Sequence, residues 1–410
     1  MTTLQVNPLT RVEGLGQILI NLEGERLSHV ELRLTEPPRL FESLLCGRHI
    51  DEVPMLVSRI CAICATPHAL AAILALEQAL QVKPPEAAEY VRELALLGDL
   101  VQSHALHLFA LVLPDQLHTD SLVELLRADN TAARNGLALK QFGNRVQELA
   151  GGRLIHPINL VTGGVSYLPD PDSLQQVATA SREWQRHLDP WQELFSTHPA
   201  DHAPAEACGI PLAVAVDTEL TLWGTQLSQP DATLPVADYK LWIAESSVEK
   251  SHARRVTAPR GCWRVGALAR RELSGHPPRT GAHGIFANNL AQLTEIGLAL
   301  SRIEELCDQL LSLPKKSQLR MTPEPQSGIG TVALEAPRGT LIHQYGIDDD
   351  GRIATADIIT PTTINQVAIE EQLYADLAHS TPPEHLELLA GQVVRAFDPC
   401  ISCAVHLLRR

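Results

Sequence analysis

Two Cys-x-x-Cys pairs near opposite ends of the 410-residue chain place the strongest constraint on its fold: Cys61 with Cys64, and Cys400 with Cys403. The first pair stands just before a predicted helix and the second just after one. A three-residue offset at the end of an element lets both sulfur atoms face one ion. A fold that joins the pairs would make an all-thiolate site from both ends of the chain.

Spacing alone leaves more than one kind of site open. Structural zinc sites usually hold their two pairs roughly 15 to 20 residues apart, because the metal staples a small fold. Thioredoxin-like redox chemistry is less favoured, since neither pair follows a strand in a βαβ pattern. Thiolates prefer transition metals to magnesium or calcium, so pairs this far apart favour a buried reactive metal centre while structural zinc stays possible.

Composition excludes several other classes. The chain is 45% hydrophobic and 20% charged, as expected of a folded protein, and its net charge of −15 disfavours binding to nucleic-acid phosphates. The N-terminus lacks the pattern of a secretory signal, and we expect no apolar run of membrane-spanning length. No glycine-rich dinucleotide fingerprint follows a predicted strand.

Hydrophobic periodicity predicts a mainly α fold with small β elements (α+β), built on a long helix bundle. Alternating apolar residues predict an N-terminal β-hairpin from Ile18 to Leu34, and a late hairpin from Thr331 to Pro361 that turns at residues 348–351. Helical patterns cover residues 65–80, 86–113, 121–152, 172–196 and 288–313.

No linker marks a domain boundary, so we expect one catalytic unit over residues 1–410. Within it the patterns distinguish a β-rich part (1–58), a helical part (59–202), an irregular α+β part (203–284), a helical and hairpin part (285–406) and a short tail (407–410).

The segments around the cysteines resemble the two signature motifs of nickel-iron hydrogenase large subunits: RICAICATPH (59–68) and DPCISCAVH (398–406). The similarity continues in family order through Arg11–Gly14, Leu40–Glu42, GGRLIHP and TGGV (151–165), VGALAR (265–270), EAPRG (335–339) and TPTTIN (360–365). These blocks span almost the whole chain. The resemblance implies the catalytic subunit of a hydrogenase, which reversibly cleaves H2 heterolytically and passes electrons to an iron-sulfur partner.

The resemblance assigns the metal ligands. Cys61 and Cys400 would be terminal ligands of nickel, while Cys64 and Cys403 would bridge nickel to an iron that carries CO and CN ligands. A further magnesium or iron ion would be bound by Glu42 and His406. The cofactors implied are therefore nickel, iron with CO and CN, and magnesium or a second iron.

Other residues receive roles in the same way. Glu13 would take the proton from Cys400, and Arg338 would lie over the two metals as a catalytic and cofactor-binding residue. Thr362, with Pro361 beside it, would contact a cyanide, and His68 would donate to a bridging sulfur. Without the resemblance, each would more often be read as a structural or solvated side chain. His104, His107 and His156 stay structural or proton-path candidates.

Two departures from the common family pattern, Ala62 and Leu15, suggest a branch of cytoplasmic NAD(P)-linked or sulfhydrogenase-like enzymes. Cys46, Cys208, Cys262 and Cys307 are isolated and lack the spacing of iron-sulfur clusters, so electrons must leave through a partner. We expect an iron-sulfur small subunit, flavin- or NAD(P)-binding subunits, nickel-insertion proteins and a maturation protease that removes residues 407–410.

Rival interpretations remain. A hydrogen-sensing subunit would carry the same ligands, whereas the quinone-side scaffold subunit of complex I shares the helical scaffold but lacks the four cysteines. Structural zinc becomes remote once the family blocks are counted.

Overall fold

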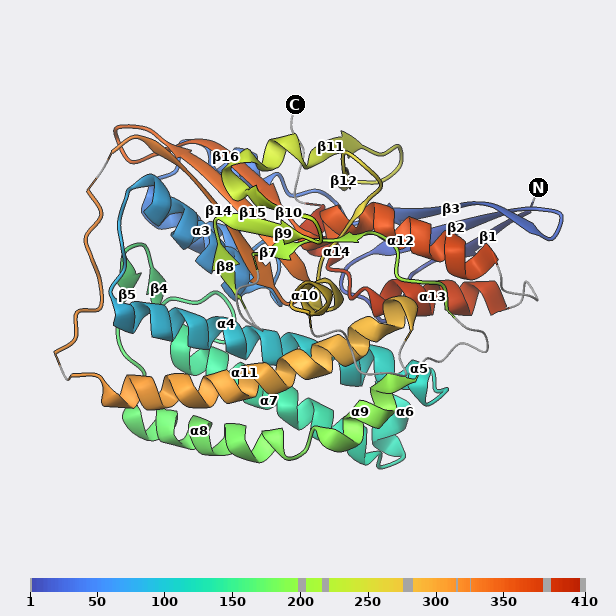
Figure 1. Cartoon of the computed structure of the whole chain (residues 1–410), viewed down its shortest axis with the longest axis horizontal. Coiled ribbons are helices and arrows are strands. Elements are labelled where there is room, and N and C mark those ends of the chain that lie inside the picture. Colours follow the sequence, from blue (N-terminus) through green and yellow to red (C-terminus); the bar gives the residue numbers. More distant parts are fainter. Residues whose placement is uncertain are drawn as a thin grey trace.

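A computed structural model describes residues 2–197, 204–215, 221–275, 283–314, 316–324, 326–378 and 385–405. His406 and the segment 407–410, to which the sequence assigns a metal ligand and a removable tail, lie outside the described residues. The fold is mainly helical with small sheets, as predicted (Figure 1).

The predicted N-terminal hairpin is present as β2 (Gly16–Glu23) and β3 (Arg26–Leu34), paired antiparallel. In β2, Ile18, Ile20 and Leu22 are buried alternately with half-buried residues, so one face of the sheet enters the core. A third strand, β1 (Thr2–Val6), pairs with β2 and was not predicted, because its largely exposed residues show no usable alternation.

Long helices form the lower layer in Figure 1, where α4, α7, α8 and α11 run side by side. They are α4 (Glu86–Leu106), α7 (Thr131–Gly151), α8 (Pro171–Gln185) and α11 (Ala287–Ser312). Above them lie α3 (Ala65–Ala79), α12 (Pro361–Ala378) and α13 (Leu386–Ala396). The predicted helical segments therefore exist as helices.

Two predicted helical stretches are each divided into two helices. The stretch 121–152 breaks before Asn130, whose side chain accepts a hydrogen bond from the Ala133 amide and so caps α7. Its first part is α6 (Leu122–Arg127), and the stretch 172–196 likewise divides into α8 and α9 (Asp189–Ser196). Asp129, which precedes the cap, has a positive φ of 63° that no helix interior allows.

The late hairpin is larger than predicted. The turn at residues 348–351 does join β15 (Gly339–Ile347) to β16 (Ile353–Ile359), but β14 (Gly328–Ala336) pairs with the other edge of β15. The two-residue turn between β14 and β15 contains Arg338. Both strands are buried on nearly every residue, so they lack the alternation that would have separated them in the sequence.

Shorter elements complete the described chain. The helices are α1 (Phe41–Leu45), α2 (Val53–Val57), α5 (Leu113–Gln116), α10 (Ala267–Leu273), α14 (Ile401–Ala404), the 3-10 turns η1 (Ile50–Glu52), η3 (Val236–Leu241) and η4 (Gly284–Phe286), and the π-helical turn η2 (His107–Val112). The strands are β4 (Leu160–Val161), β5 (Gly164–Val165), β6 (Ile210–Pro211), β7 (Ala213–Val214), β8 (Trp223–Gly224), β9 (Gln226–Gln229), β10 (Ala232–Pro235), β11 (Ala244–Ser247), β12 (Arg254–Thr257) and β13 (Trp263–Arg264). Most of the strands lie in the part predicted to be irregular.

The largest cluster of buried apolar residues joins the long helices to β14 and β15, and it contains all four paired cysteines. A separate cluster packs the N-terminal sheet against α12 and α13. The C-terminal residues Ile401, Ala404 and Val405 belong to that second cluster. The two ends of the chain therefore meet where these clusters adjoin.

The segment Glu86–Gln116 is long and apolar enough to cross a membrane by composition, contrary to our expectation that no run reaches that length. However, 89% of its apolar window is buried inside the protein. A helix buried to that extent is typical of the centre of a folded core.

Helices α4 and α7 approach each other closely at two glycines. A Cβ atom added at Gly143 would lie 2.5 Å from the Gln102 backbone nitrogen, and one added at Gly98 would lie 2.6 Å from the Gln147 backbone nitrogen. Backbone atoms cannot move aside as the end of a side chain can. Glycine at these positions thus sets the distance between the two helices.

We predict that Gly143→Ala lowers the free energy of unfolding by roughly 1–3 kcal/mol, because the added methyl group forces α4 and α7 apart. Gly297→Ala is the matched control, since an added Cβ there meets only the flexible Leu188 side chain at 3.3 Å. Thermal unfolding of the two variants should show a lower midpoint for Gly143→Ala only. Equal midpoints would contradict the close-packing argument.

Candidate metal centre

The two cysteine pairs are placed by the ends of helices. Cys64 is the N-cap of α3, and Cys400 follows α13 and is the N-cap of the short helix α14. The first pair thus precedes a helix and the second follows one, as predicted.

The four sulfur atoms converge in the core. All lie within 4.8 Å of one another, and all four residues are buried. The sulfur of Cys400 lies 2.6 Å from that of Cys403, 3.5 Å from that of Cys61 and 4.0 Å from that of Cys64. No disulfide joins them. Among the described residues, this is the one group of metal-ligating side chains found so close together.

The protonation preferences of these thiols indicate that the site needs a cation. Hydrogen bonds from Cys400, Cys403 and Cys64 lower the pKa of Cys61 well below its usual value. Burial, in contrast, raises the pKa of both Cys400 and Cys403 well above theirs. The protein alone therefore stabilises one thiolate but not four. Soft metal ions supply the positive charge that would stabilise the remaining thiolates, so the donor set fits nickel and iron.

Arg338, in the turn between β14 and β15, lies over this group. Its Nη1 donates to the Cys64 sulfur at 3.4 Å, and its Nε donates to the Asp398 carboxylate at 3.1 Å. The side chain is 3% exposed, and its Nη2 has no hydrogen-bond partner among the described residues. A buried guanidinium N–H without a partner is costly, so this atom fits a site that also holds small anionic ligands such as cyanide.

Asp398 orients Arg338 and was not predicted from the sequence, although it belongs to the DPCISC segment. Its second oxygen accepts from Gln292 Nε2 at 3.0 Å. Burial alone would raise the pKa of Asp398, but the charge of Arg338 lowers it. The Asp398 carboxylate thus fixes the Arg338 guanidinium that also contacts the Cys64 sulfur.

Thr362 is buried at the start of α12, next to Pro361, the first residue of that helix. Its hydroxyl oxygen accepts a hydrogen bond from the Cys400 amide at 2.7 Å. The hydroxyl proton remains able to donate elsewhere. Thr362 therefore positions Cys400 directly, which its sequence motif alone did not reveal.

Glu13 lies against the C-terminal pair. Its backbone oxygen accepts from the Ile401 amide at 3.0 Å, and its carboxylate accepts from the Ser402 amide at 3.1 Å. Burial, and then the charge of Cys61, raise the pKa of Glu13, whereas hydrogen bonds from Ser402 and Cys400 act in the opposite direction. This carboxyl group is therefore within reach of the Cys400 thiol and holds a proton more readily than an exposed glutamate.

Arg11, two residues before Glu13, forms its side-chain hydrogen bonds with other partners. Its guanidinium bonds the Leu111 carbonyl at 2.7 Å and the Asp115 carboxylate at 2.5 Å. Asp115 also accepts two hydrogen bonds from Arg395 on α13, at 2.7 and 3.0 Å. Asp115 therefore ties the segment before Glu13 to the helix that leads to Cys400.

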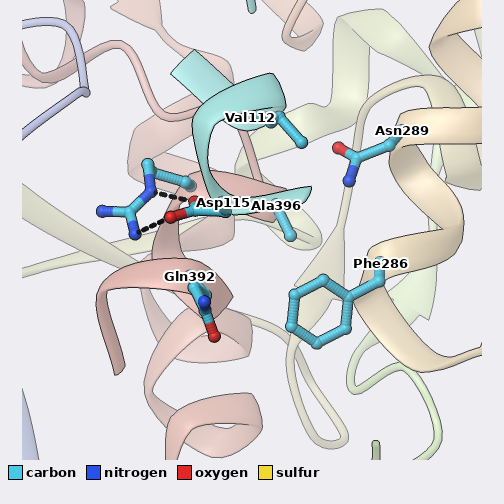
Figure 2. Close-up of a pocket in the computed structure, with 7 residues that line it drawn as sticks. Val112, Asp115, Phe286, Asn289, Gln392 and Ala396 are labelled. Atoms are coloured by element: carbon cyan, nitrogen blue, oxygen red, sulfur yellow. Dashed lines mark hydrogen bonds and ion pairs between the residues drawn. The ribbon is translucent and has the colours of Figure 1, made fainter. Parts of the chain in front are cut away.

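A small cavity of about 10 Å³ lies beside this ion pair. Figure 2 shows Asp115 and Gln392 on one side of it and Phe286 and Asn289 on the other. Its volume is near the lower limit for a single water molecule. The cavity is too small for an organic substrate.

His68 lies one turn along α3 from Cys64 and is fully buried. Its Nδ1 lies 3.2 Å from His343 Nε2, and His343 Nδ1 lies 2.7 Å from the Tyr345 hydroxyl. Burial lowers the pKa of His68 to about 4, so the ring is neutral near pH 7. The predicted donation from His68 to a bridging sulfur remains a prediction, while its contact with His343 was not foreseen.

Glu42 of α1 is 7% exposed and accepts a hydrogen bond from the Ile358 amide at 2.8 Å. Its carboxylate therefore contacts the end of β16. Its expected partner in metal binding, His406, lies outside the described residues.

Two further residues near the site were missed by sequence reasoning. Asp99 of α4 is fully buried beside Arg338, burial raises its pKa, and its Oδ2 has no partner in the described part of the chain. Arg39 donates to the carbonyl groups of Arg59 and Ser402, one in each cysteine segment. Neither stands in a motif that a single sequence makes conspicuous.

The remaining histidine candidates have structural partners. His104 Nε2 contacts Glu295 at 2.9 Å, inside a buried cluster with Arg270. His107 contacts Gln292 and the Arg395 carbonyl, and His156 contacts the Ser58 carbonyl at 3.1 Å. Each therefore joins neighbouring segments and need not carry protons.

The sequence matches the model of the nickel-dependent hydrogenase family over residues 39–139 and 269–406. The chain is 33% identical to the sulfhydrogenase 2 subunit alpha of Pyrococcus furiosus, over 99% of both chains, and 32% identical to the sulfhydrogenase 1 subunit alpha of the same organism, over 99% of this chain and 98% of that one. Its fold is similar to a chain of an NAD+-reducing [NiFe]-hydrogenase in the H2-reduced state, with a TM-score of 0.88, 29% identity and coverage of 99% and 100%.

We predict that Cys61→Ser strongly lowers the nickel content of the purified chain, because a serine hydroxyl is a harder and far less acidic ligand than a thiol. Cys307→Ser is the matched control: Cys307 is equally buried, but it lies in α11 outside the group, and burial raises its pKa to about 12. Metal analysis should find nickel reduced only in the first variant. Similar losses in both would show that the effect comes from misfolding.

Proposed function

The chain belongs to the nickel-dependent hydrogenase family as a catalytic subunit, an oxidoreductase that acts on H2, and from this premise we propose a role for each residue of the site. The observation that carries the proposal is the convergence of four buried sulfur atoms near Arg338, whose Nη2 has no hydrogen-bond partner in the part of the chain that the structure describes. No other group of side chains in the described ranges offers a comparable metal site.

Cys61 and Cys400 are proposed as terminal ligands of nickel, and Cys64 and Cys403 as ligands that nickel and iron share. When bound, a nickel-iron centre with CO and CN ligands supplies the position at which H2 binds and is split. Arg338 would direct its free N–H groups toward that position, and Thr362 would donate its hydroxyl proton to a cyanide. Pro361 fixes the start of the helix that carries Thr362, and His68 would donate to a shared sulfur.

Glu13 is proposed to accept the proton that leaves the Cys400 sulfur. The backbone bond from Ile401 and the carboxylate bond from Ser402 hold this side chain in place, so little reorganisation is needed when the proton moves. Burial raises the pKa of Glu13, which makes its carboxylate a better proton acceptor than that of an exposed glutamate.

Glu42 and His406 are proposed to bind a magnesium ion or a second iron behind the site. Mixed carboxylate and imidazole ligation suits a divalent ion that keeps several water molecules. A metal there would fix the C-terminus against β16. We also propose that residues 407–410 are removed during maturation, which an intact mass of the nickel-loaded chain ending at His406 would support.

The relatives are named as subunits of larger hydrogenases, so this chain works within a multisubunit enzyme. We propose an iron-sulfur small subunit as the direct electron acceptor, with flavin- or NAD(P)-binding subunits beyond it and a cytoplasmic location. Nickel-insertion proteins and a protease would act before assembly. The whole chain, residues 1–410 in the precursor, is proposed to act as one catalytic unit.

Infrared spectroscopy of the complex tests the centre directly. Bands of metal-bound carbonyl and cyanide are expected, together with nickel and iron in comparable amounts. Their absence would refute the proposed centre. Steady H2-dependent reduction of NAD(P)+ would support the enzyme, whereas negligible turnover with any soluble carrier would favour a hydrogen sensor.

We predict that Glu13→Gln lowers H2 oxidation by about 10²-fold or more, the usual contribution of a positioned proton acceptor. The amide can keep the hydrogen bond from the Ser402 amide, so the infrared bands and the metal content should stay as in the unsubstituted enzyme. Near-normal turnover with intact bands would show that the proton leaves by another group.

A further inference from the structure

Ser402 is one of the two residues between the C-terminal cysteines, and all three of its polar groups form hydrogen bonds with the N-terminal part of the chain. Its amide donates to the Glu13 carboxylate at 3.1 Å, and its hydroxyl donates to both oxygens of Glu36 at 2.9 Å. Its carbonyl oxygen accepts from Arg39 Nη2 at 2.9 Å. A residue with no assigned chemistry thus has a complete set of partners from distant sequence.

The neighbouring Ile401 fits the same region by shape. It is fully buried, and a Cβ atom added at Gly14 would lie only 2.6 Å from the Ile401 Cβ. One added at Gly16 would lie 2.9 Å from the Ile401 Cδ1. Gly14 also has a φ of +89°, which disfavours other residues. These two glycines leave the space that the isoleucine occupies.

Arg39 joins both halves of the site. Besides the Ser402 carbonyl, its guanidinium donates to the carbonyls of Arg59 and Ile60, which immediately precede Cys61. One side chain therefore sets the distance between the two cysteine segments. Its guanidinium also lies 5.4 Å from the centre of the Phe41 ring, a contact that limits its freedom.

We propose that Glu13, Gly14, Gly16, Glu36 and Arg39 form a socket for Ile401 and Ser402, and that Glu36 and Arg39 are positioning residues that hold the C-terminal cysteine pair over the N-terminal pair. The inference rests on the proposed function only in taking these pairs as the two halves of the metal centre. The occupant of the socket is the C-terminal segment of the same chain.

The socket explains how the two C-terminal cysteines are held in place. Cys400 and Cys403 lie on a short segment after α13, and α14 has only four residues, so little regular structure holds it. Hydrogen bonds to charged groups are the stronger ones in proteins, and Ser402 has them at three points. Its fixation therefore sets the positions of both flanking sulfurs.

The test is hydrogen–deuterium exchange of the assembled, metal-loaded enzyme. We expect Arg39→Gln to raise exchange about tenfold in peptides covering residues 398–405 and 59–64, because each lost charge-assisted bond is worth roughly that factor. Exchange in α11 should not change. Arg302→Gln is the matched control, since Arg302 is a half-buried arginine of α11 that makes three hydrogen bonds, to Glu93 and Glu305, and none to the socket.

A second, smaller substitution distinguishes a local effect on the socket from misfolding of the chain. Ser402→Ala removes only the hydroxyl, and we expect a smaller, local rise in exchange at residues 398–405. Adding Glu36→Gln to Ser402→Ala should raise exchange no further, because both changes remove the same interaction.

Unchanged exchange at residues 398–405 in both Arg39→Gln and Ser402→Ala would overturn the socket. The socket would also be overturned if Arg302→Gln raised exchange at residues 398–405 as much as Arg39→Gln does. If the unsubstituted complex contains no nickel and iron, the proposed function fails instead. In that case exchange in the same variants still decides whether the socket holds the segment.

Discussion

The structure depends on one electrostatic constraint, the burial of four thiols around a single point. Bare thiolates repel one another and lose hydration when buried, so the protein can hold them as ligands only with a cation among them. Burial opposes ionisation of Cys400 and Cys403 while hydrogen bonds from the other cysteines favour it at Cys61. This constraint explains the residues around the thiols. Where a metal ion does not fully neutralise the anionic ligands, fixed donors such as Arg338 must stabilise the remaining negative charge.

Buried ion pairs carry much of this positioning. Arg338 with Asp398 lies over the sulfurs, while Arg395 with Asp115 holds the helix that leads to Cys400. Arg270 lies between Glu295 and Glu335, and joins α10, α11 and β14. Such pairs often add little net stability, since desolvation offsets much of their attraction. Their value here is geometric: each guanidinium fixes two or more groups from different elements in one plane.

The sequence predicts the elements and ligands better than the contacts between them. The four cysteines and the N-terminal hairpin follow from spacing and alternation, which are local properties. Arg39, Asp99 and Asp398 could not be recognised, because an isolated charged residue shows nothing of its burial or its partner until the chain is folded. Strand β14 was missed for a related reason: a strand buried on both faces has no periodicity to distinguish it. The role of Thr362 as an acceptor for the Cys400 amide likewise exists only in three dimensions.

The site's origin in both ends of the chain also bears on how it forms. Closing a flexible loop between Cys64 and Cys400 would cost about 5 kcal/mol of chain entropy, and this cost grows only slowly with length. The helices and β14–β16 that lie between the two pairs hold α3 and α13 in fixed positions in the folded chain, so the cysteine contacts alone need not offset that cost. What remains is to place the few residues after Ala396.

Three hydrogen bonds place these residues. The Cys400 amide donates to Thr362, the Ile401 amide donates to Glu13, and the Ser402 carbonyl accepts from Arg39. A small number of directed hydrogen bonds thus holds the C-terminal pair beside the N-terminal pair. The large scaffold and the short closing segment thus have separate tasks: the first excludes water and sets distances, and the second completes the ligand shell.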